Sequence, residues 1–103
     1  MKAVRVGGLP EGPLAAAAQF YAGVVPGLTV AEDTVLVFHP ADHTHRGWRL
    51  AAVQQLARDH APIRVNALAS DDEAAIAAAL AYLETAPGVT GQYLPLDGNG
   101  AQA

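Results

Sequence analysis

Short apolar runs alternate along this chain with longer stretches in which apolar residues recur at helical spacing. Residues 34–38 (TVLVF) form an unbroken apolar run, and residues 2–8 (KAVRVGG), 63–69 (IRVNALA) and 92–96 (QYLPL) are further short runs. An unbroken run is typical of a strand that is buried on both faces of a parallel sheet. The pattern therefore predicts four strands.

Three helices are predicted between these strands. Pro13 suits the first position of a helix over residues 13–25, which Pro26 and Gly27 end. Residues 44–60 and 72–86 give the second and third helices. The predicted apolar faces are Leu14, Ala17, Ala18, Tyr21 and Val24 in the first helix, Trp48, Ala52, Val53 and Leu56 in the second, and Ile76, Leu80 and Leu83 in the third. The opposite, solvent-facing side of the second helix is predicted to carry Arg49, Gln54, Gln55, Arg58 and Asp59.

This β-α-β-α-β-α-β alternation predicts an α/β fold with a four-stranded parallel sheet. The 103 residues suit one domain over residues 1–103, with a loosely held tail at about 98–103. Ser70, Asp71, Asp72 and Glu73 are interpreted as a capping box at the start of the third helix.

Composition excludes several classes of function. Ten acidic and six basic residues give a formal net charge of −4, so nucleic acid is not an expected partner. No cysteine is present, which excludes disulfides and thiolate chemistry. The sequence has neither a signal peptide nor a run of about 18 apolar residues, so we expect a cytoplasmic protein that does not bind membranes.

The polar segment over residues 39–49 (HPADHTHRGWR) is the main candidate for chemistry. Its histidines do not have the spacing of three or four that a shared helix face requires of metal ligands, since His43 and His45 are two residues apart. The favoured interpretation is a solvated loop and helix start, with no metal. The alternative is a proton-transfer or ligand-contact site made of Asp42, His43, His45 and Arg46.

Residues 7–13 (GGLPEGP) lack the G-x-G-x-x-G order of a dinucleotide-binding turn. The prolines remove hydrogen-bond donors, and Glu11 would repel a pyrophosphate. We therefore interpret this segment as a turn followed by a helix start, and we expect no cofactor.

Three later stretches follow one another in a distinctive order: IRVN at residues 63–66, EAAIAAALAYL at 73–83 and TGQYLPLDG at 90–98. They resemble the short-chain dehydrogenase/reductase (SDR) family, in which an IRVN strand precedes an EIA-x-A-x-x-FL helix and a last strand ending TG-x-x-L-x-x-DGG. The matching residues are Arg64, Val65, Asn66, Ala75, Ile76, Tyr82, Leu83, Thr90, Gly91, Gln92, Asp97 and Gly98. The resemblance implies half of a Rossmann-like SDR fold, a truncated form without the nucleotide-binding half.

The same resemblance places the family's catalytic residues. With residues 56–59 (LARD) aligned to the family's L-A-x-E, the reactive tyrosine falls at Asp42 and the lysine at Arg46. An aspartate is ionised at neutral pH, and an arginine does not reproduce the lysine's geometry. The family's serine falls near His39 or Pro40, and its nicotinamide-contacting P-G is replaced by Ser70 and Asp71. The resemblance therefore implies a protein that is not an enzyme.

Three hypotheses for function follow. The leading one is a non-catalytic SDR-like protein that acts through assembly, as a homo-oligomer or as a structural or regulatory subunit of a full-length SDR ketoreductase. In the family's tetramers, two long helices and the last helix with its strand form the subunit contacts. The alternatives are a small enzyme that uses the Asp/His/Arg site, and a small-ligand binding module at the carboxyl ends of the strands.

Assembly is also expected from the strands. Right-handed crossovers in one direction place their helices on one face of the sheet. The family resemblance also allows the last helix to lie on the opposite face, and in either case much of one face is expected to be bare. Because the strands are apolar throughout, a bare face would form an interface, and the chain is predicted not to be a monomer.

Overall fold

Four parallel strands lie in the sheet in the order in which they occur along the chain. In the computed structural model, which describes residues 1–96, they are β1 (Lys2–Arg5), β2 (Thr34–Phe38), β3 (Val65–Ala69) and β4 (Tyr93–Pro95). Each pairs in parallel with the next. The predicted α/β fold with a four-stranded parallel sheet is confirmed. The matched residues Asp97 and Gly98 and the predicted loose tail lie outside the described residues.

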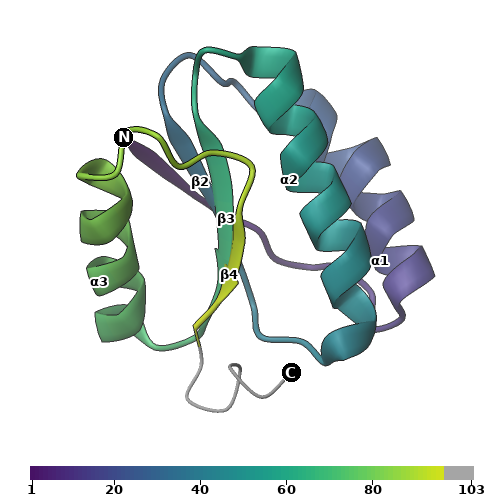
Figure 1. Cartoon of the computed structure of the whole chain (residues 1–103). Coiled ribbons are helices and arrows are strands. Elements are labelled where there is room, and N and C mark those ends of the chain that lie inside the picture. The colour runs from purple at the N-terminus through teal and green to yellow at the C-terminus, as the bar shows by residue number, and fades with distance from the viewer. Residues whose placement is uncertain (97–103) are drawn as a thin grey trace.

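Helices cover both faces of this sheet (Figure 1). The helices on one face are α1 (Pro13–Gln19), continued by a π-helical turn η1 (Phe20–Val24) and a 3-10 turn η2 (Val25–Gly27), and α2 (Arg46–His60), preceded by the 3-10 turn η3 (His43–His45). On the other face lies α3 (Glu73–Glu84). All three connections advance in the same direction across the sheet, so the third has the opposite hand to the first two.

Two hydrophobic clusters result, one on each face. Leu36 and Phe38 of β2 pack toward α1 and α2, whereas Val35 and Val37 pack toward Ile76 and Leu83 of α3. The alternation follows from the pleat of the strand. The expectation that one face stays bare is wrong over β2 and β3, because α3 covers them.

On β1 the same face of the sheet carries exposed residues. Ala3 and Arg5 pair with Val35 and Val37 and share their face, and both are exposed. Since Arg5 is charged and Ala3 is small, this strip is not the broad apolar patch that the sequence was expected to leave. Within residues 1–96, no helix has the length and apolar character needed to cross a bilayer.

Several predicted details are wrong in ways that have physical causes. In the first helix Leu14, Ala18 and Tyr21 are exposed, and the buried residues are Ala16 and Phe20. The helix is apolar all round, so the spacing of its apolar residues does not identify the buried face. The helix also changes to a π-helical turn at Phe20.

The third helix is capped by a different residue from the one predicted. Asp72 is the N-cap, and its Oδ1 accepts from the backbone N–H groups of Ala74, at 3.0 Å, and Ala75, at 3.4 Å. Ser70 instead accepts from the Asp72 N–H. Of the predicted stripe, Ile76 and Leu83 are buried and Leu80 is half-buried.

Candidate functional site

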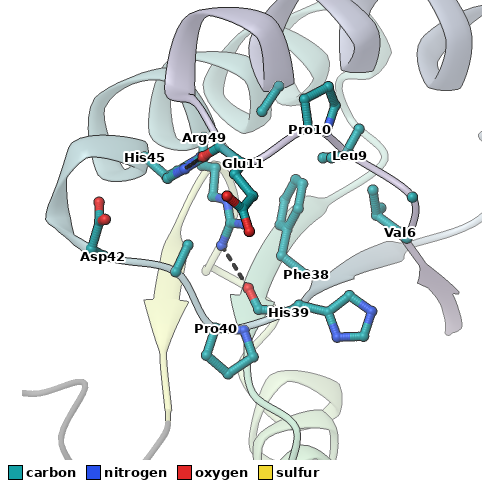
Figure 2. A pocket seen from close by; sticks show the side chains of 14 residues that line it. Val6, Leu9, Pro10, Glu11, Phe38, His39, Pro40, Asp42, His45 and Arg49 are labelled. Carbon is teal, nitrogen blue, oxygen red and sulfur yellow. Dashed lines mark hydrogen bonds between the residues drawn. The ribbon is translucent and has the colours of Figure 1, made fainter.

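A pocket of about 400 Å³ opens at the carboxyl ends of β1 and β2 (Figure 2). The segment after β1 forms one wall with Leu9, Pro10 and Glu11, and the segment after β2 forms another with His39, Pro40 and Asp42. Phe38 lies between them, and His45 and Arg49 enter from the start of α2. This is the edge at which open α/β sheets bind ligands.

Arg49 is the unusual residue of the pocket, because its charge is buried and no residue of the described range 1–96 supplies a counter-charge. Its exposed fraction is 4 %, and no carboxylate within residues 1–96 forms an ion pair with it. Nη1 donates to the His39 carbonyl at 2.9 Å and to the Tyr93 hydroxyl at 3.0 Å, while Nε is buried without a partner. The guanidinium carbon lies 4.5 Å from the centre of the Phe38 ring.

The sequence analysis placed Arg49 on the solvent-facing side of its helix, which is wrong. Arg49 precedes Ala52 and Val53 by three and four residues, and it therefore lies on the same buried stripe. The charge of Arg49 led to the solvent-facing prediction, because an arginine is rarely fully buried unless it is paired. The helical spacing of Arg49 from Ala52 and Val53 was the signal that could have found it.

His45 holds the wall of the pocket together. The Trp48 indole N–H donates to its Nδ1 at 3.0 Å, so in neutral His45 the proton lies on Nε2, which donates to the Glu11 carbonyl at 2.7 Å. Both ring nitrogens are thus used in joining the segment after β1 to α2. The prediction of a solvated loop is wrong at His45, whose exposed fraction is only 6 %.

The residues of the alternative site do not converge. Asp42 is the N-cap of η3; its carboxylate accepts from the hydroxyl and the backbone N–H of Thr44, and these two hydrogen bonds lower the pKa of Asp42. Asp42 and His45 line the pocket, whereas His43 and Arg46 are exposed outside it. The structure therefore brings together two of the four residues.

A second pocket, of about 360 Å³, adjoins the first and includes residues of the α3 side. At its edge, His39 Nδ1 lies 2.9 Å from Asp71 Oδ1, and both side chains are exposed. Nearby, Arg5 makes two hydrogen bonds to Glu73, at 2.8 and 2.9 Å. These bonds raise the pKa of Arg5 and lower that of Glu73. Sequence reasoning missed both pairs, since their members are far apart in the chain.

Within residues 1–96, no three histidine, aspartate or glutamate side chains are grouped closely enough to hold a metal ion. A comparison of the chain with known protein families gives a match. The model of the SDR-like family, described as short chain dehydrogenase-like protein, matches residues 4–96. The chain belongs to the SDR-like family. No curated protein and no solved structure matches it. The sheet and helices correspond to half of a Rossmann-like SDR fold.

Several residues that carry the SDR resemblance serve the fold of this SDR-like chain. The Asn66 amide donates to the Val89 carbonyl at 3.0 Å and accepts from the Gln92 N–H at 3.0 Å. The Thr90 hydroxyl accepts from the Val65 N–H, and the Gly91 N–H donates to the Val65 carbonyl. These bonds fix the connection from α3 to β4. The family-like residues Asn66, Thr90 and Gly91 therefore have a structural role in this chain.

The sequence analysis aligned the SDR catalytic tyrosine and lysine with Asp42 and Arg46. Asp42 precedes the helix and its carboxylate is engaged by Thr44, whereas Arg46 begins α2 and is exposed. A carboxylate with a lowered pKa is ionised at neutral pH and has no proton to give. The pair does not offer the hydroxyl and ammonium groups on which the family's chemistry depends.

Proposed function

We propose that this SDR-like chain is non-catalytic and acts through assembly, as a homo-oligomer or as a structural or regulatory subunit of a full-length SDR ketoreductase. The contact surface proposed is the outer face of α1 and η1, with Leu14 and Tyr21 at its centre. The absence of a hydroxyl donor at Asp42 and of a lysine at Arg46 supports the non-catalytic part of the proposal.

One observation carries the proposal: this outer face is exposed and carries no charge. Residues 13–31 contain no acidic, basic or histidine side chain. Within this segment Leu14 is 85 % exposed and Tyr21 46 % exposed. Exposed helix faces usually carry charged residues, as α2 does with Arg46, Arg58 and Asp59. A charge-free face with a large aliphatic and an aromatic residue has the composition of an interface.

Sedimentation at low micromolar concentration tests self-assembly. The chain has a mass of 10.6 kDa, and we expect a dimer or larger species. Leu14→Glu combined with Tyr21→Glu should give the monomer mass, because a charge buried without a partner at an interface is strongly unfavourable. Tyr82→Glu, on the exposed face of α3, is the matched control and should leave the assembly unchanged.

The outcomes separate the parts of the proposal. Dissociation by Tyr82→Glu alone would keep assembly but move the contact to α3. A wild-type mass of 10.6 kDa would contradict self-assembly and leave only a subunit role beside a full-length SDR ketoreductase. That role would be tested by co-purification of the wild type and of the double variant with such a reductase.

A second candidate function is small-ligand binding at the carboxyl ends of the strands. The pocket of about 400 Å³ beside Arg49 favours it, since ligand sites are concave and have a few polar groups in apolar walls. The other alternative, a small enzyme that uses Asp42, His43, His45 and Arg46, has less support because two of these residues lie outside the pocket.

A further inference from the structure

We propose that the pocket beside Arg49 binds a small organic monocarboxylate, and that the guanidinium of Arg49 is the counter-charge for its carboxylate. This inference rests on the second candidate function, ligand binding, and does not depend on assembly. It names the chemical class of the ligand and the residue that recognises it.

The burial of Arg49 is the first argument. Moving an ionised group out of water is costly unless it is paired, and buried charges in proteins are therefore paired or hydrogen-bonded. Arg49 is 4 % exposed, yet both of its hydrogen bonds are to neutral oxygens and both use Nη1. Since no ion pair to Arg49 exists within residues 1–96, a ligand anion would supply the missing charge.

The second argument is the guanidinium nitrogen that remains unused. The bonds to His39 and Tyr93 occupy Nη1, and within residues 1–96 Nε is buried without a partner. No hydrogen bond from these residues uses Nη2, which is not buried, so Nη2 is the nitrogen open to a ligand. An N–H group of a guanidinium forms a charge-assisted hydrogen bond to a carboxylate oxygen, so Nη2 can donate to a carboxylate that enters the pocket.

The position of Arg49 is fixed before any ligand binds. The His39 carbonyl and the Tyr93 hydroxyl hold Nη1, and the Phe38 ring lies 4.5 Å from the guanidinium carbon. A recognition group that is already held in place loses little conformational entropy on binding. Arg49 is in this sense a preorganised anion-recognition residue.

The rest of the lining selects among anions. The other ionisable groups in the pocket are Glu11, Asp42, His39 and His45, and both carboxylates are exposed. Two negative groups oppose a phosphate, which carries more charge than a monocarboxylate. Val6, Leu9 and Phe38 add apolar wall, which suits a hydrocarbon body. The combination favours a carboxylate with an apolar body, such as a short fatty or aromatic acid.

The only tryptophan gives a direct readout. Trp48 lies next to Arg49 in the chain, and its ring is 5.8 Å from the guanidinium carbon. The full chain would be titrated with hexanoate, benzoate, their neutral amides and inorganic phosphate while Trp48 fluorescence is followed. We expect saturable changes in fluorescence with the two carboxylates. The amides and phosphate should bind about tenfold more weakly, because the amides carry no charge and phosphate carries more negative charge than a monocarboxylate.

Variants assign the response to Arg49. Arg49→Met, of similar length, should abolish the carboxylate response, whereas Arg58→Met, an exposed arginine of the same helix, should leave it unchanged. Glu11→Gln should strengthen carboxylate binding about threefold by removing a repelling charge. If Arg49→Met does not fold by circular dichroism, the Arg49 Nε–H resonance of the wild type, followed through the same titrations, replaces it.

Each result decides the proposal. Equal binding of benzamide and benzoate, or a carboxylate response that persists in Arg49→Met, would overturn the carboxylate assignment and leave ligand binding in place. Tighter binding of phosphate than of benzoate would overturn the monocarboxylate class. If none of the probes changes Trp48 fluorescence or the Arg49 Nε–H resonance, the carboxylate assignment fails, and ligand binding loses its support at the same time.

Discussion

Arg64 donates to both carboxylate oxygens of Asp33, from its backbone N–H at 2.8 Å and from Nε at 3.0 Å. Nη1 of the same arginine donates to the carbonyls of Leu83, at 2.9 Å, and Ala86, at 2.7 Å. One side chain thus joins the residue before β2, the start of β3 and the end of α3. The arginine of the family-like IRVN stretch is therefore used here as a structural tie.

This tie predicts a pH-dependent contribution to stability. The hydrogen bonds from Arg64, the backbone N–H first, lower the pKa of Asp33 below its ordinary value of 3.8. A carboxyl with a lowered folded-state pKa stabilises the fold above its unfolded-state pKa, and the stabilisation is lost as the pH falls through the folded-state value. Asp33→Asn should therefore cost about 1 kcal/mol at pH 7, a modest value because Asp33 is partly exposed.

The free energy of unfolding, measured by urea titration between pH 7 and pH 3, checks this. The difference between wild type and Asp33→Asn should shrink below about pH 4. Glu84→Gln, the same loss of charge at the exposed end of α3, serves as control and should show no such dependence. A difference that stays constant down to pH 3 would mean that the charge of Asp33 does not contribute.

The fold could be predicted from the sequence because its signals are local. The run over residues 34–38 has only apolar residues after Thr34, and all five residues are buried, as a central strand of a parallel sheet requires. Pro87 and Gly88 lie just beyond the end of α3, as predicted, whereas Pro26 and Gly27 lie within the 3-10 turn η2 that closes the first helical segment. The place of α3 on the second face was harder to predict, because the hand of a crossover depends on packing and the general rule favours the other hand.

The site could be predicted only in part, because its geometry depends on contacts between distant segments. His45 was listed as a candidate for its chemistry, but its partners Glu11 and Trp48 give it a structural role. Arg49 was assigned to the solvent face because an arginine is rarely buried unless it is paired, although its spacing from Ala52 and Val53 matches the buried stripe of the helix. The carbonyl of His39 and the hydroxyl of Tyr93 that hold Arg49 lie 10 and 44 residues away.

Gly91 is predicted to be sensitive to substitution. Its φ is +74°, a conformation that residues with a Cβ rarely adopt. An added Cβ would lie at ordinary contact distance, 3.7 Å, from Ala57 Cβ, so the expected cost comes from the backbone conformation. Gly91→Ala should therefore lower the free energy of unfolding by about 1–2 kcal/mol. Gly88→Ala, where an added Cβ meets nothing within 4 Å, should change it by less than about 0.5 kcal/mol. Equal effects in thermal unfolding would show that the backbone at Gly91 is not strained by a side chain.

Dinucleotides are predicted not to bind this chain at physiological concentration. Residues 7–13 do not form the glycine turn that receives a pyrophosphate, and the Glu11 carboxylate lies in the wall of the pocket that follows. Calorimetric titration with NADH and NADPH should show no dissociation constant below about 100 μM, which corresponds to roughly −5.5 kcal/mol. A saturating isotherm below that limit would contradict this prediction and the non-catalytic proposal together.

Two histidines in one 3-10 turn are predicted to differ in how much the same substitution destabilises the fold. His45→Ala removes the acceptor of the Trp48 indole N–H and the donor to the Glu11 carbonyl, and it leaves a half-buried N–H without its partner. It should cost about 2 kcal/mol of unfolding free energy. His43→Ala, two residues earlier and exposed, should change stability by less than about 0.5 kcal/mol.

Substitution of the exposed residues near His45 is predicted to leave assembly unchanged. Asp42→Asn and Arg46→Ala should, like His43→Ala, leave assembly intact, because these exposed side chains are not part of the proposed contact face around Leu14 and Tyr21. Sedimentation of the three variants and urea titration of both histidine variants provide the measurements. If His43→Ala, Asp42→Asn or Arg46→Ala abolished a biological activity while fold and mass were unchanged, Asp42, His43, His45 and Arg46 would have to act as a site. The non-catalytic proposal would then be wrong.

The stability of His45→Ala is a separate test. If this variant were as stable as the wild type, the hydrogen bonds of His45 to Glu11 and Trp48 would not stabilise the contact between the segment after β1 and α2.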